Sequence, residues 1–382
     1  MRSFDFQPST RVIFGENSID QLGELTTELD GKRVLLVTDP GIVEAGHVEK
    51  GIRALQKAGI ESFIFKDVEE NPTTRHVENG VRFAKERLPI DAIIGFGGGS
   101  AMDCAKGINF ILTNGGKMED YWGIGKAAKP MLPSIGIPTT AGTGSEAQSF
   151  ALIAQEGTHQ KMACGDNKAR FHTVILDPAL VRSVPKDVAA VTGIDAISHA
   201  VESYVSTKSN PYSRMFSKEA WRLLSASYEI ILNDPDNLKV WGEMQLGAHF
   251  AGMAIENSML GAAHACANPL TAHYGITHGV AVSMMLPHVV RFNGQVVNGY
   301  YDDLVESAGL KLQKKGAGPE QIAHRIVDLK EASGLPLRLR DLKVDEKDLP
   351  QLADEAARQW TGEFNPRPVN EQELLKLYES AF

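Results

Sequence analysis

The residues with the clearest chemical potential are an aspartate and three histidines in the second half of the chain. Asp195 and His199 are four residues apart in a segment with helical spacing, so they lie on one helix face and can share an ion. His264 stands among small residues, and His278 stands at the start of a predicted helix. Three imidazoles and one carboxylate suit Fe²⁺ or Zn²⁺ and leave one position open for a substrate oxygen.

Spacing alone does not choose the metal ligands. The chain has 11 histidines, and five of them fall between residues 249 and 288. His249, His273 and His288 therefore remain candidates beside the two already named in this stretch. A single histidine is also often an ordinary buried or capping residue, so the ligand set stays open at this point.

A run of glycines offers a place for a phosphate. Gly97, Gly98, Gly99 and Ser100 follow a predicted strand and open a predicted helix. Glycines let backbone N–H groups approach a phosphate, and a helix start adds donors and a favourable dipole. The run lacks the last glycine of the G-x-G-x-x-G fingerprint and the lysine of a P-loop, so a plain tight turn is the alternative.

A second loop, residues 138–146 (PTTAGTGSE), also follows a predicted strand. Its hydroxyl groups belong to Thr139, Thr140, Thr143 and Ser145. Such an array of small donors suits a pyrophosphate or a ribose, although Thr and Ser are also common helix caps. Two such loops after two strands of one sheet favour a nucleotide site.

Asp39 ends another predicted strand. An acidic side chain at the carboxyl end of a strand can bind both ribose hydroxyls of adenosine and would repel the 2′-phosphate of NADP. The residue therefore predicts a preference for NAD. Because Asp39 precedes the glycine run, the reverse of the Rossmann order, an ordinary turn residue is the alternative.

Composition limits the class of protein. The 382 residues are too many for one ordinary domain and favour two. A formal net charge of -9 makes nucleic acid and anionic lipid poor partners. We find no apolar stretch of the roughly 18 residues that a membrane span needs, and no signal-peptide pattern. The three widely spaced cysteines, Cys104, Cys164 and Cys266, form no CxxC pair and predict a reducing cytoplasm.

The pattern of elements places a domain boundary near residue 184. The first part alternates short apolar runs with helical stretches, which predicts βαβ units and a mainly parallel sheet. Its expected strands are Val34–Asp39, Ser62–Val68, Asp91–Phe96, Ser134–Pro138 and Thr173–Asp177. The second part shows no convincing strand, and its expected helices are Asp187–Ser206, Ser213–Leu232, Leu238–Ala254, Gly279–Val290 and Pro319–Ala332. We therefore expect an α/β domain at 1–184 and an all-helical domain at 185–382.

The chain resembles the iron-dependent (group III) alcohol dehydrogenase family almost from end to end. The motifs that carry the resemblance are RVIFG (Arg11–Gly15), ENPT (Glu70–Thr73), GGGSAMDCAK, PTTAGTGSE, ILDPA (Ile175–Ala179), GIDAISHAVESY, LGAAHACANPL, THGVAVSMMLPHVVRFN, GLPLRLRDL and NPRP. So many motifs in order are far more specific than one glycine loop.

The resemblance implies the dehydroquinate synthase-like fold of that family, with a dinucleotide-binding α/β domain, a helical domain and a metal in the cleft between them. It implies the metal ligands Asp195, His199, His264 and His278. The implied NAD-binding positions are Asp39, Asn71, Gly97, Gly98, Gly99, Ser100, Asp103, Thr139, Thr140, Thr143 and Lys161. Ser145 and Glu146 would stiffen the hydroxyl loop. A homodimer or larger homo-oligomer is also implied.

Two positions depart from the family pattern. Asn268 stands where relatives usually have a histidine that helps proton movement, and an amide cannot carry a proton near pH 7. His273 is the nearest histidine that could replace it, although it could equally lie on the surface. Ala147 and Gln148 stand where Val-Thr is usual, on the substrate side.

The expected reaction is hydride transfer between NAD(H) and a small alcohol, aldehyde or ketone, helped by one divalent metal, Fe²⁺ before Zn²⁺. The alternative keeps the fold and the metal but acts on a polyol or a phosphorylated substrate, as dehydroquinate synthase and glycerol dehydrogenase types do. A phosphorylated substrate needs several cationic side chains, and the segment 261–287 contains no Lys or Arg. A third reading, a non-catalytic metal- or NAD-binding module, leaves the complete ligand set unexplained.

Overall fold

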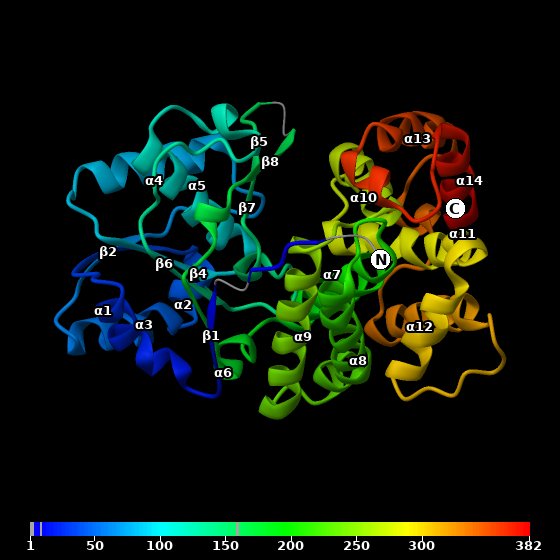
Figure 1. Cartoon of the computed structure of the whole chain (residues 1–382), viewed down its shortest axis with the longest axis horizontal. Coiled ribbons are helices and arrows are strands. Elements are labelled where there is room, and N and C mark those ends of the chain that lie inside the picture. Colours follow the sequence, from blue (N-terminus) through cyan, green and yellow to red (C-terminus); the bar gives the residue numbers. More distant parts are fainter. Residues whose placement is uncertain (1–3, 8–9, 158–159) are drawn as a thin grey trace. The chain divides into compact units, whose positions relative to one another are not determined.

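The computed structural model describes residues 4–7, 10–157 and 160–382, and the chain divides into two compact units (Figure 1). The sheet unit comprises Gln7–Thr140 and Ser145–Val184. The helical unit comprises Pro185–Phe382, the short segment Ala141–Gly144 and the described residues of Met1–Phe6. The chain therefore crosses between the units more than once, and the hydroxyl loop identified in the sequence is divided between them.

The sheet unit is built on a six-stranded parallel sheet. The strand order is β1 (Arg11–Phe14), β9 (Thr173–Leu176), β6 (Ser134–Pro138), β4 (Ala92–Gly97), β2 (Arg33–Val37) and β3 (Glu61–Phe65). The inner strands are buried along almost their whole length, as expected for a parallel sheet covered on both faces. All five predicted strands are present near their predicted bounds, and the edge strand β1 is the one in this sheet that the sequence analysis did not predict.

The register of the sheet brings three loops to one edge. Val37 of β2 pairs with Gly95 of β4, and Gly97 of β4 pairs with Pro138 of β6. Because these strands are parallel, the segments that follow them leave the sheet at the same edge. Those segments begin at Thr38, Gly98 and Thr139, which are the loops that the sequence analysis assigned to a nucleotide.

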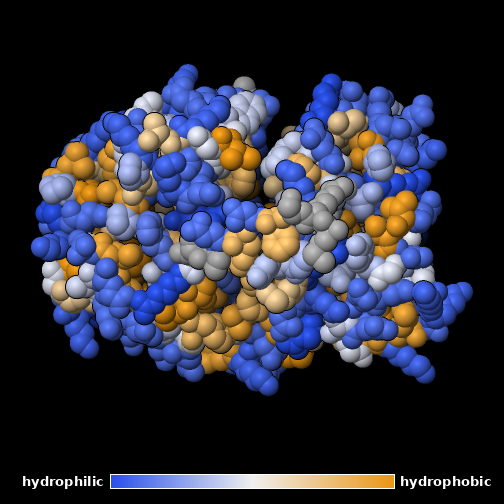
Figure 2. All heavy atoms as spheres, viewed as in Figure 1, coloured by the Kyte–Doolittle hydropathy of each residue, from blue (hydrophilic) through white to orange (hydrophobic). Residues whose placement is uncertain are grey.

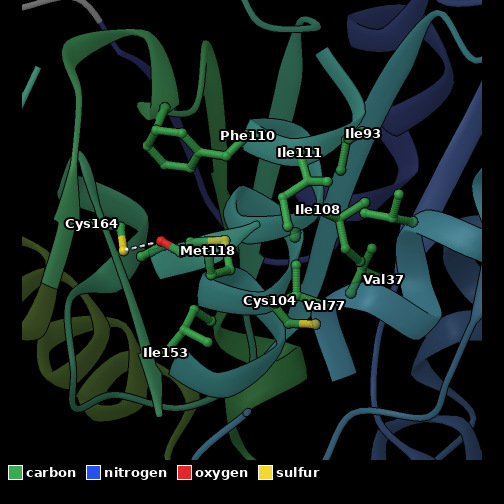
Figure 3. Packing of buried hydrophobic residues seen from close by; sticks show 14 of the residues in the cluster. Val37, Val77, Ile93, Cys104, Ile108, Phe110, Ile111, Met118, Ile153 and Cys164 are labelled. Carbon is green, nitrogen blue, oxygen red and sulfur yellow. Dashed lines mark hydrogen bonds between the residues drawn. The ribbon is translucent and has the colours of Figure 1, made fainter. Parts of the chain in front are cut away.

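Helices cover both faces of this sheet, as Figure 1 shows. They are α1 (Leu22–Glu28), α2 (Pro40–Glu44), α3 (His47–Lys57), α4 (Thr74–Lys85), α5 (Gly99–Asn114) and α6 (Pro178–Val181). One core lies under α4 and α5, where Cys104 and Ile108 gather with Val77 (Figure 3). This packing anchors α5, whose first residues form the glycine loop.

A smaller sheet completes the sheet unit. Its order is β5 (Gly123–Ile124), β8 (Lys161–Gly165) and β7 (Phe150–Ala154), and β7 pairs with β8 in antiparallel register. The sequence analysis did not predict these strands. Short 3-10 helices lie at Ser18–Gln21 (η1), Met118–Tyr121 (η2), Ser145–Ala147 (η3) and Asn167–Ala169 (η4).

The helical unit contains only helices and connecting segments in its described residues. Its helices are α7 (Lys186–Val205), α8 (Pro211–Asn233), α9 (Leu238–Glu256), α10 (Ala262–Tyr274), α11 (His278–Ser307), α12 (Gly318–Ser333), α13 (Leu349–Ala357) and α14 (Glu371–Ala381), with 3-10 turns η5 (Leu339–Leu342), η6 (Glu346–Asp348) and η7 (Trp360–Phe364). The five predicted helices are all present. α11 extends well beyond the predicted Val290 and bends at Val297, whose backbone leaves the helical region.

The distribution of polar and apolar residues on the surface is typical of a globular protein. The visible face carries mainly hydrophilic residues with smaller apolar patches among them (Figure 2), which is normal for a folded protein. Within the described ranges, none of the helices combines the length and the apolar character needed to cross a bilayer.

Candidate metal centre and cofactor loops

Three of the predicted metal ligands come together inside the helical unit. His199 Nε2 lies 3.6 Å from Asp195 Oδ1, as the four-residue spacing on α7 predicts, and His264 Nε2 of α10 lies 3.9 Å from the same oxygen. One ligand atom from each of the three lies within 4.8 Å of the others, and all three residues are buried. This is the only group of three or more potential ligands of this kind in the described part of the chain.

His278 adjoins this group at the start of α11. Its ring centroid lies 5.3 Å from that of His264. Gly279 makes the approach of α11 to α7 possible, because a Cβ there would lie 2.3 Å from Val191 O and 3.2 Å from Asp195 Cβ. The glycine that follows His278 therefore brings the first turn of α11 against the helix that carries Asp195.

The donor atoms of this group fit a transition metal. His264 Nε2, which lies beside Asp195 Oδ1, is buried and has no hydrogen-bond partner among the described residues. Leaving such a group unsatisfied costs about 1–3 kcal/mol, so its place in this cluster indicates a missing partner. Burial is the largest influence on His199 and lowers its pKa, which favours the neutral imidazole that binds metals.

The other candidate histidines have different surroundings. The side chain of His273 is 38 % exposed, and its Nε2 lies 2.8 Å from a carboxylate oxygen of Glu355. Burial, with Arg291 and Lys330 nearby, lowers the pKa of His288 to about 4. His249 is buried on α9 with its ring 6.2 Å from that of Phe250.

Sequence reasoning missed the residue that holds His264. Glu202 Oε2 lies 2.5 Å from His264 Nδ1, and both side chains are buried. Glu202 is three residues beyond His199 in the motif GIDAISHAVESY. At that spacing it lies near the same face of the helix, which is the sequence feature that could have indicated a role at the metal centre. Its partner is 62 residues away, which the sequence alone does not reveal.

Asn268 lies one helical turn after His264 on α10 and has a specific partner. Its Nδ2 donates to Gln359 Oε1 at 2.9 Å. The amide is therefore held by a second amide from the segment before η7. The sequence analysis did not single out Gln359.

The carboxylate of Asp39 lies beside the glycine loop. A Cβ placed on Gly97 would be 3.0 Å from Asp39 Oδ2. Asp39 also caps α2, because its Oδ1 accepts a hydrogen bond from Ile42 N at 3.1 Å. Burial raises the pKa of Asp39, while the backbone N–H groups of Ile42 and Gly41 oppose the rise.

The first turn of α5 is open to a ligand. Gly98 is its N-cap residue and gives no side-chain cap, so the N–H groups of the first turn have no capping side chain in the part of the chain that the structure describes. A Cβ on Gly98 would lie 3.6 Å from Thr140 Cγ2, which places the hydroxyl loop next to the glycine loop. The two loops meet, as two neighbouring parallel strands predict.

Two buried hydroxyl groups at this edge of the sheet fit a bound nucleotide. The Oγ1 atoms of Thr38 and Thr139 are buried without a hydrogen-bond partner in the part of the chain that the structure describes. Thr139 also donates its backbone N–H to Gly97 O at 3.0 Å, which fixes the start of its loop. Thr38 was not among the predicted cofactor residues.

A buried network joins α5 to the hydroxyl loop. Ser145 Oγ donates to Asp103 Oδ1 at 2.5 Å, and Lys106 Nζ donates to Ser145 O at 2.7 Å. Burial raises the pKa of Asp103, and the Lys106 ammonium and the Ser145 hydroxyl oppose the rise. The predicted stiffening role of Ser145 therefore has a defined set of contacts, with Lys106 as a member that the sequence analysis did not name.

The strand β7 connects the segments that carry Asn71 and Lys161. Lys161 of β8 pairs with Ala154, and Thr73 forms a parallel bridge with the same residue. Asn71 has a left-handed φ of 54°, which asparagine tolerates better than most residues. Both side chains are exposed. The unpredicted hairpin β7–β8 thus positions a predicted cofactor residue.

Residues 141–144 of the hydroxyl loop pack within the helical unit. A Cβ on Gly142 would lie 2.6 Å from Thr192 Cβ of α7, and a Cβ on Gly144 would lie 2.7 Å from Gly252 Cα of α9. The loop requires glycine at both positions because the helices approach its backbone so closely. Thr143 lies in this segment, whereas Thr139 and Thr140 belong to the sheet unit.

Comparison with known protein families identifies the chain. The family model described as iron-containing alcohol dehydrogenase matches residues 9–178, and the model of the C-terminal part of the Fe-containing alcohol dehydrogenase family matches residues 189–382. The chain is 35 % identical over 386 residues to the 1,3-propanediol dehydrogenase of Citrobacter freundii, covering 100 % of this chain and 99 % of that protein. It is 30 % identical to the lactaldehyde reductase of Escherichia coli (strain K12), covering 97 % of each.

Solved structures agree with this result. A 1,3-propanediol oxidoreductase superimposes with a TM-score of 0.96 at 35 % identity, covering 100 % of both chains. The sulfoacetaldehyde reductase of Bifidobacterium kashiwanohense, solved in complex with NAD+, gives a TM-score of 0.91 at 26 % identity, covering 100 % of this chain and 99 % of that one.

The chain belongs to the iron-containing alcohol dehydrogenase family. It is an alcohol dehydrogenase, an oxidoreductase of alcohols and aldehydes, and its fold is the one the sequence predicted. The resemblance carried by the motifs is confirmed. The relatives also favour the alcohol or aldehyde reaction over the alternative of a polyol or phosphorylated substrate.

Proposed function

We propose that this protein is an NAD-dependent, metal-dependent dehydrogenase of small alcohols and aldehydes that are uncharged or weakly charged. The observation that carries the proposal is the buried group of Asp195, His199 and His264, in which His264 Nε2 faces Asp195 and lacks a hydrogen-bond partner among the described residues. In an alcohol dehydrogenase, such a donor set is suited to hold a metal ion that activates the substrate. A divalent ion held there would polarise the substrate C–O bond and favour the alkoxide.

The proposed ligands are Asp195, His199, His264 and His278, with Fe²⁺ preferred and Zn²⁺ possible. Asp195 supplies the charge, and the histidines supply neutral nitrogen donors, which both ions accept. The helix α7 fixes Asp195 and His199 one turn apart, and Gly279 lets His278 approach them. The 185–382 domain is therefore the proposed metal-binding domain.

The proposed cofactor site belongs to the 1–184 domain. Its residues are Asp39, Asn71, Gly97, Gly98, Gly99, Ser100, Asp103, Thr139, Thr140, Thr143 and Lys161. The open first turn of α5 suits the pyrophosphate, and Asp39 beside Gly97 suits the adenosine ribose. The NAD+ complex of the related sulfoacetaldehyde reductase supports the choice of cofactor.

The sequence around His264 and His278 supports an uncharged or weakly charged substrate. Residues 261–287 carry no Lys, Arg, Asp or Glu, so this stretch offers no partner for a phosphate or an ammonium group. A small alcohol or aldehyde needs no such charged partner. A strong preference for a phosphorylated substrate in a panel assay would contradict this part of the proposal.

We further propose a homodimer or larger homo-oligomer in a reducing cytoplasm. The edge strand β1 exposes the apolar side chains of Val12 and Phe14, which are 40 % and 46 % accessible, and an exposed apolar edge strand is typical of a contact surface. All three cysteines are buried and free, which suits a compartment where thiols stay reduced. Sedimentation of the purified chain tests the first point.

One assay tests the central proposal. The purified chain is stripped of metal, reloaded with Fe²⁺ or Zn²⁺, and supplied with NAD+ and a panel of small alcohols. Accumulation of NADH that depends on both the metal and the alcohol is expected. A chain that binds metal and NAD+ but produces no NADH with any alcohol, and consumes none with any aldehyde, would contradict the proposed reaction.

A further inference from the structure

The helix that carries His264 has an N-terminus capped from outside. Its N-cap residue, Gly261, has no side chain to accept the first N–H groups of α10. Two distant side chains do so instead. Asn365 Oδ1 accepts from Ala262 N at 3.2 Å, and Glu202 Oε1 accepts from Ala263 N at 2.7 Å.

Gly261 makes room for both acceptors. A Cβ at this position would lie 2.9 Å from Asn365 Oδ1 and 3.0 Å from Glu202 Oε1. Any ordinary capping residue would therefore collide with the two groups that replace it. The first turn of α10 is shaped to receive a carboxylate, which the helix dipole also favours.

Asn365 is itself held in one orientation. Its Nδ2 donates to Asn293 Oδ1 and to Arg367 O, both at 2.7 Å, and Asn293 Nδ2 donates back to Asn365 Oδ1 at 3.0 Å. This explains the NPRP segment of the sequence, to which no role had been assigned. The segment supplies the amide that completes the cap of α10.

The second oxygen of Glu202 acts on the proposed ligand. Glu202 Oε2 lies 2.5 Å from His264 Nδ1, with the two side chains 3 % and 4 % exposed. An ionised carboxylate only accepts hydrogen bonds, so the proton of the neutral imidazole lies on Nδ1. Nε2 then presents its lone pair toward Asp195 Oδ1, 3.9 Å away.

We propose that Glu202 is a positioning residue of the metal centre. It fixes His264 in the Nδ1–H tautomer and fixes the first turn of α10, so that Nε2 is ready to bind the ion. Carboxylate–histidine contacts of this kind typically change metal affinity by about 10–100-fold. The inference rests on the proposed function, because it takes His264 as a ligand.

The variant E202Q separates the two contacts. The glutamine oxygen can still accept from Ala263 N, but its N–H₂ then faces His264 Nδ1 and requires an acceptor there. The proton moves to Nε2, and the lone pair for the metal is lost. In the reverse orientation the N–H₂ group would face the N–H of Ala263, so glutamine cannot satisfy both partners.

The variant D177N is the matched control. Asp177 is a fully buried carboxylate in the sheet unit that accepts from Asn17 N at 3.0 Å, Ile19 N at 3.2 Å and Ala179 N at 3.0 Å. It holds backbone N–H groups, as Glu202 does, but it has no imidazole partner among the residues that the structure describes. D177N reports the cost of neutralising a buried capping carboxylate without touching the ligands.

The test measures Zn²⁺ affinity of the full chain after removal of metal, in competition with a chromophoric chelator. E202Q is expected to weaken Zn²⁺ binding by about 10–100-fold, and D177N to leave it unchanged. The ¹⁵N spectrum of the histidines in the metal-free chain gives the second readout. His264 is expected as the Nδ1–H tautomer in the unmodified protein and as the Nε2–H tautomer in E202Q.

The outcomes distinguish the inference from the proposed function. If the unmodified chain binds neither Zn²⁺ nor Fe²⁺, both the proposed metal centre and the role of Glu202 are wrong. If it binds Zn²⁺ tightly and E202Q binds equally well, the metal centre stands and the positioning role is overturned. Should E202Q fail to fold, the ¹⁵N spectrum of the unmodified protein still tests the inference. An Nε2–H tautomer of His264 in that spectrum would overturn it.

Discussion

At the scale of single residues, Asp39 determines the expected cofactor. Its carboxylate lies beside Gly97 and would face the 2′-phosphate of NADP if the adenosine ribose binds there. Replacing Asp39 by Gly removes that repulsion and should raise the rate with NADP while lowering the affinity for NAD. Initial rates with both cofactors check this, and equal rates in the unmodified protein would contradict the assignment. Asp39 also caps α2, so some loss of stability is expected.

The ligand set makes a second prediction at this scale. His264→Ala and His278→Ala should each lose bound metal and activity while far-ultraviolet circular dichroism remains that of a folded chain. His249→Ala and His288→Ala serve as controls and should retain the metal. Elemental analysis of the purified variants measures the result. A full complement of metal in His264→Ala would show that the ligands were chosen wrongly.

Asn268 carries the third prediction. Because its Nδ2 is engaged by Gln359, we expect Asn268 to shape the pocket rather than to move protons. Asn268→Ala should change KM or cofactor affinity more than the pH profile. Asn268→His should introduce a new titration between about pH 6 and 8 in the pH–rate profile.

His273 is the control for that prediction. It is exposed and paired with Glu355, so it belongs to the surface of the unit. His273→Ala should cost less than about tenfold in kcat, whereas general acid–base groups usually contribute roughly 10²–10⁴-fold. A larger loss would make His273 the proton relay after all.

At the scale of elements, the N-terminus of α10 gives the fourth prediction. Gly261→Ala should destabilise the protein by about 1–3 kcal/mol, because the new methyl group displaces Glu202 and Asn365 from the N–H groups they satisfy. Gly299→Ala is the control, since a Cβ there meets nothing within 4 Å in α11 and should stabilise by about 0.5–1 kcal/mol. Denaturant unfolding of both variants gives the sign of each change.

The elements differ in how far the sequence predicts them. The central strands are continuous apolar runs bounded by turns, and this pattern is sufficient because the strands are buried on both faces. Helix α10 escaped prediction because it is rich in small residues and contains Pro269, which usually ends a helix. Strands β7 and β8 escaped because short apolar runs do not distinguish strand from helix.

In the candidate site, the sequence predicts contacts within one element but not contacts between distant elements. The pair Asp195 and His199 follows from helical spacing, because both residues lie on one element. The contact of Glu202 with His264 joins residues 62 positions apart, and that of Asn365 with Ala262 joins residues 103 positions apart. Such contacts depend on how helices pack, which local patterns do not encode.

At the scale of the whole molecule, the proposed cofactor site and the proposed metal ligands belong to different units. The open helix start and the buried hydroxyls of the proposed cofactor site lie in the sheet unit, apart from Thr143, and the proposed ligands lie in the helical unit. The hydroxyl loop contributes residues to both units, because Thr139 and Thr140 belong to the sheet unit and residues 141–144 pack within the helical unit. A substitution of Gly142 or Gly144 should therefore disturb both the proposed cofactor residue Thr143 and the helix that the glycine contacts, since each glycine lies close to a helix.

The buried side chain of Lys330 should make the free energy of unfolding depend on pH. Lys330 of α12 is 1 % exposed, and its Nζ lies 3.2 Å from the thioether sulfur of Met284 on α11. Burial lowers the pKa of Lys330 to about 8, with Asp341 opposing the shift. The folded chain therefore binds this proton more weakly than the unfolded chain, whose lysine has a pKa near 10.5.

The sign of the effect follows from these two values. Above pH 10.5 the lysine is neutral in both states and costs nothing, whereas the penalty grows as the pH falls from 10.5 to about 8 and is complete below that. Lys330→Met removes the charge and keeps the length of the side chain. It should stabilise the protein by up to about 3 kcal/mol at pH 7, and the gain should disappear as the pH rises past 10.5. Unfolding of both proteins across this pH range measures the difference, and a gain that is equal at pH 7 and pH 11 would show that packing, not charge, is its cause.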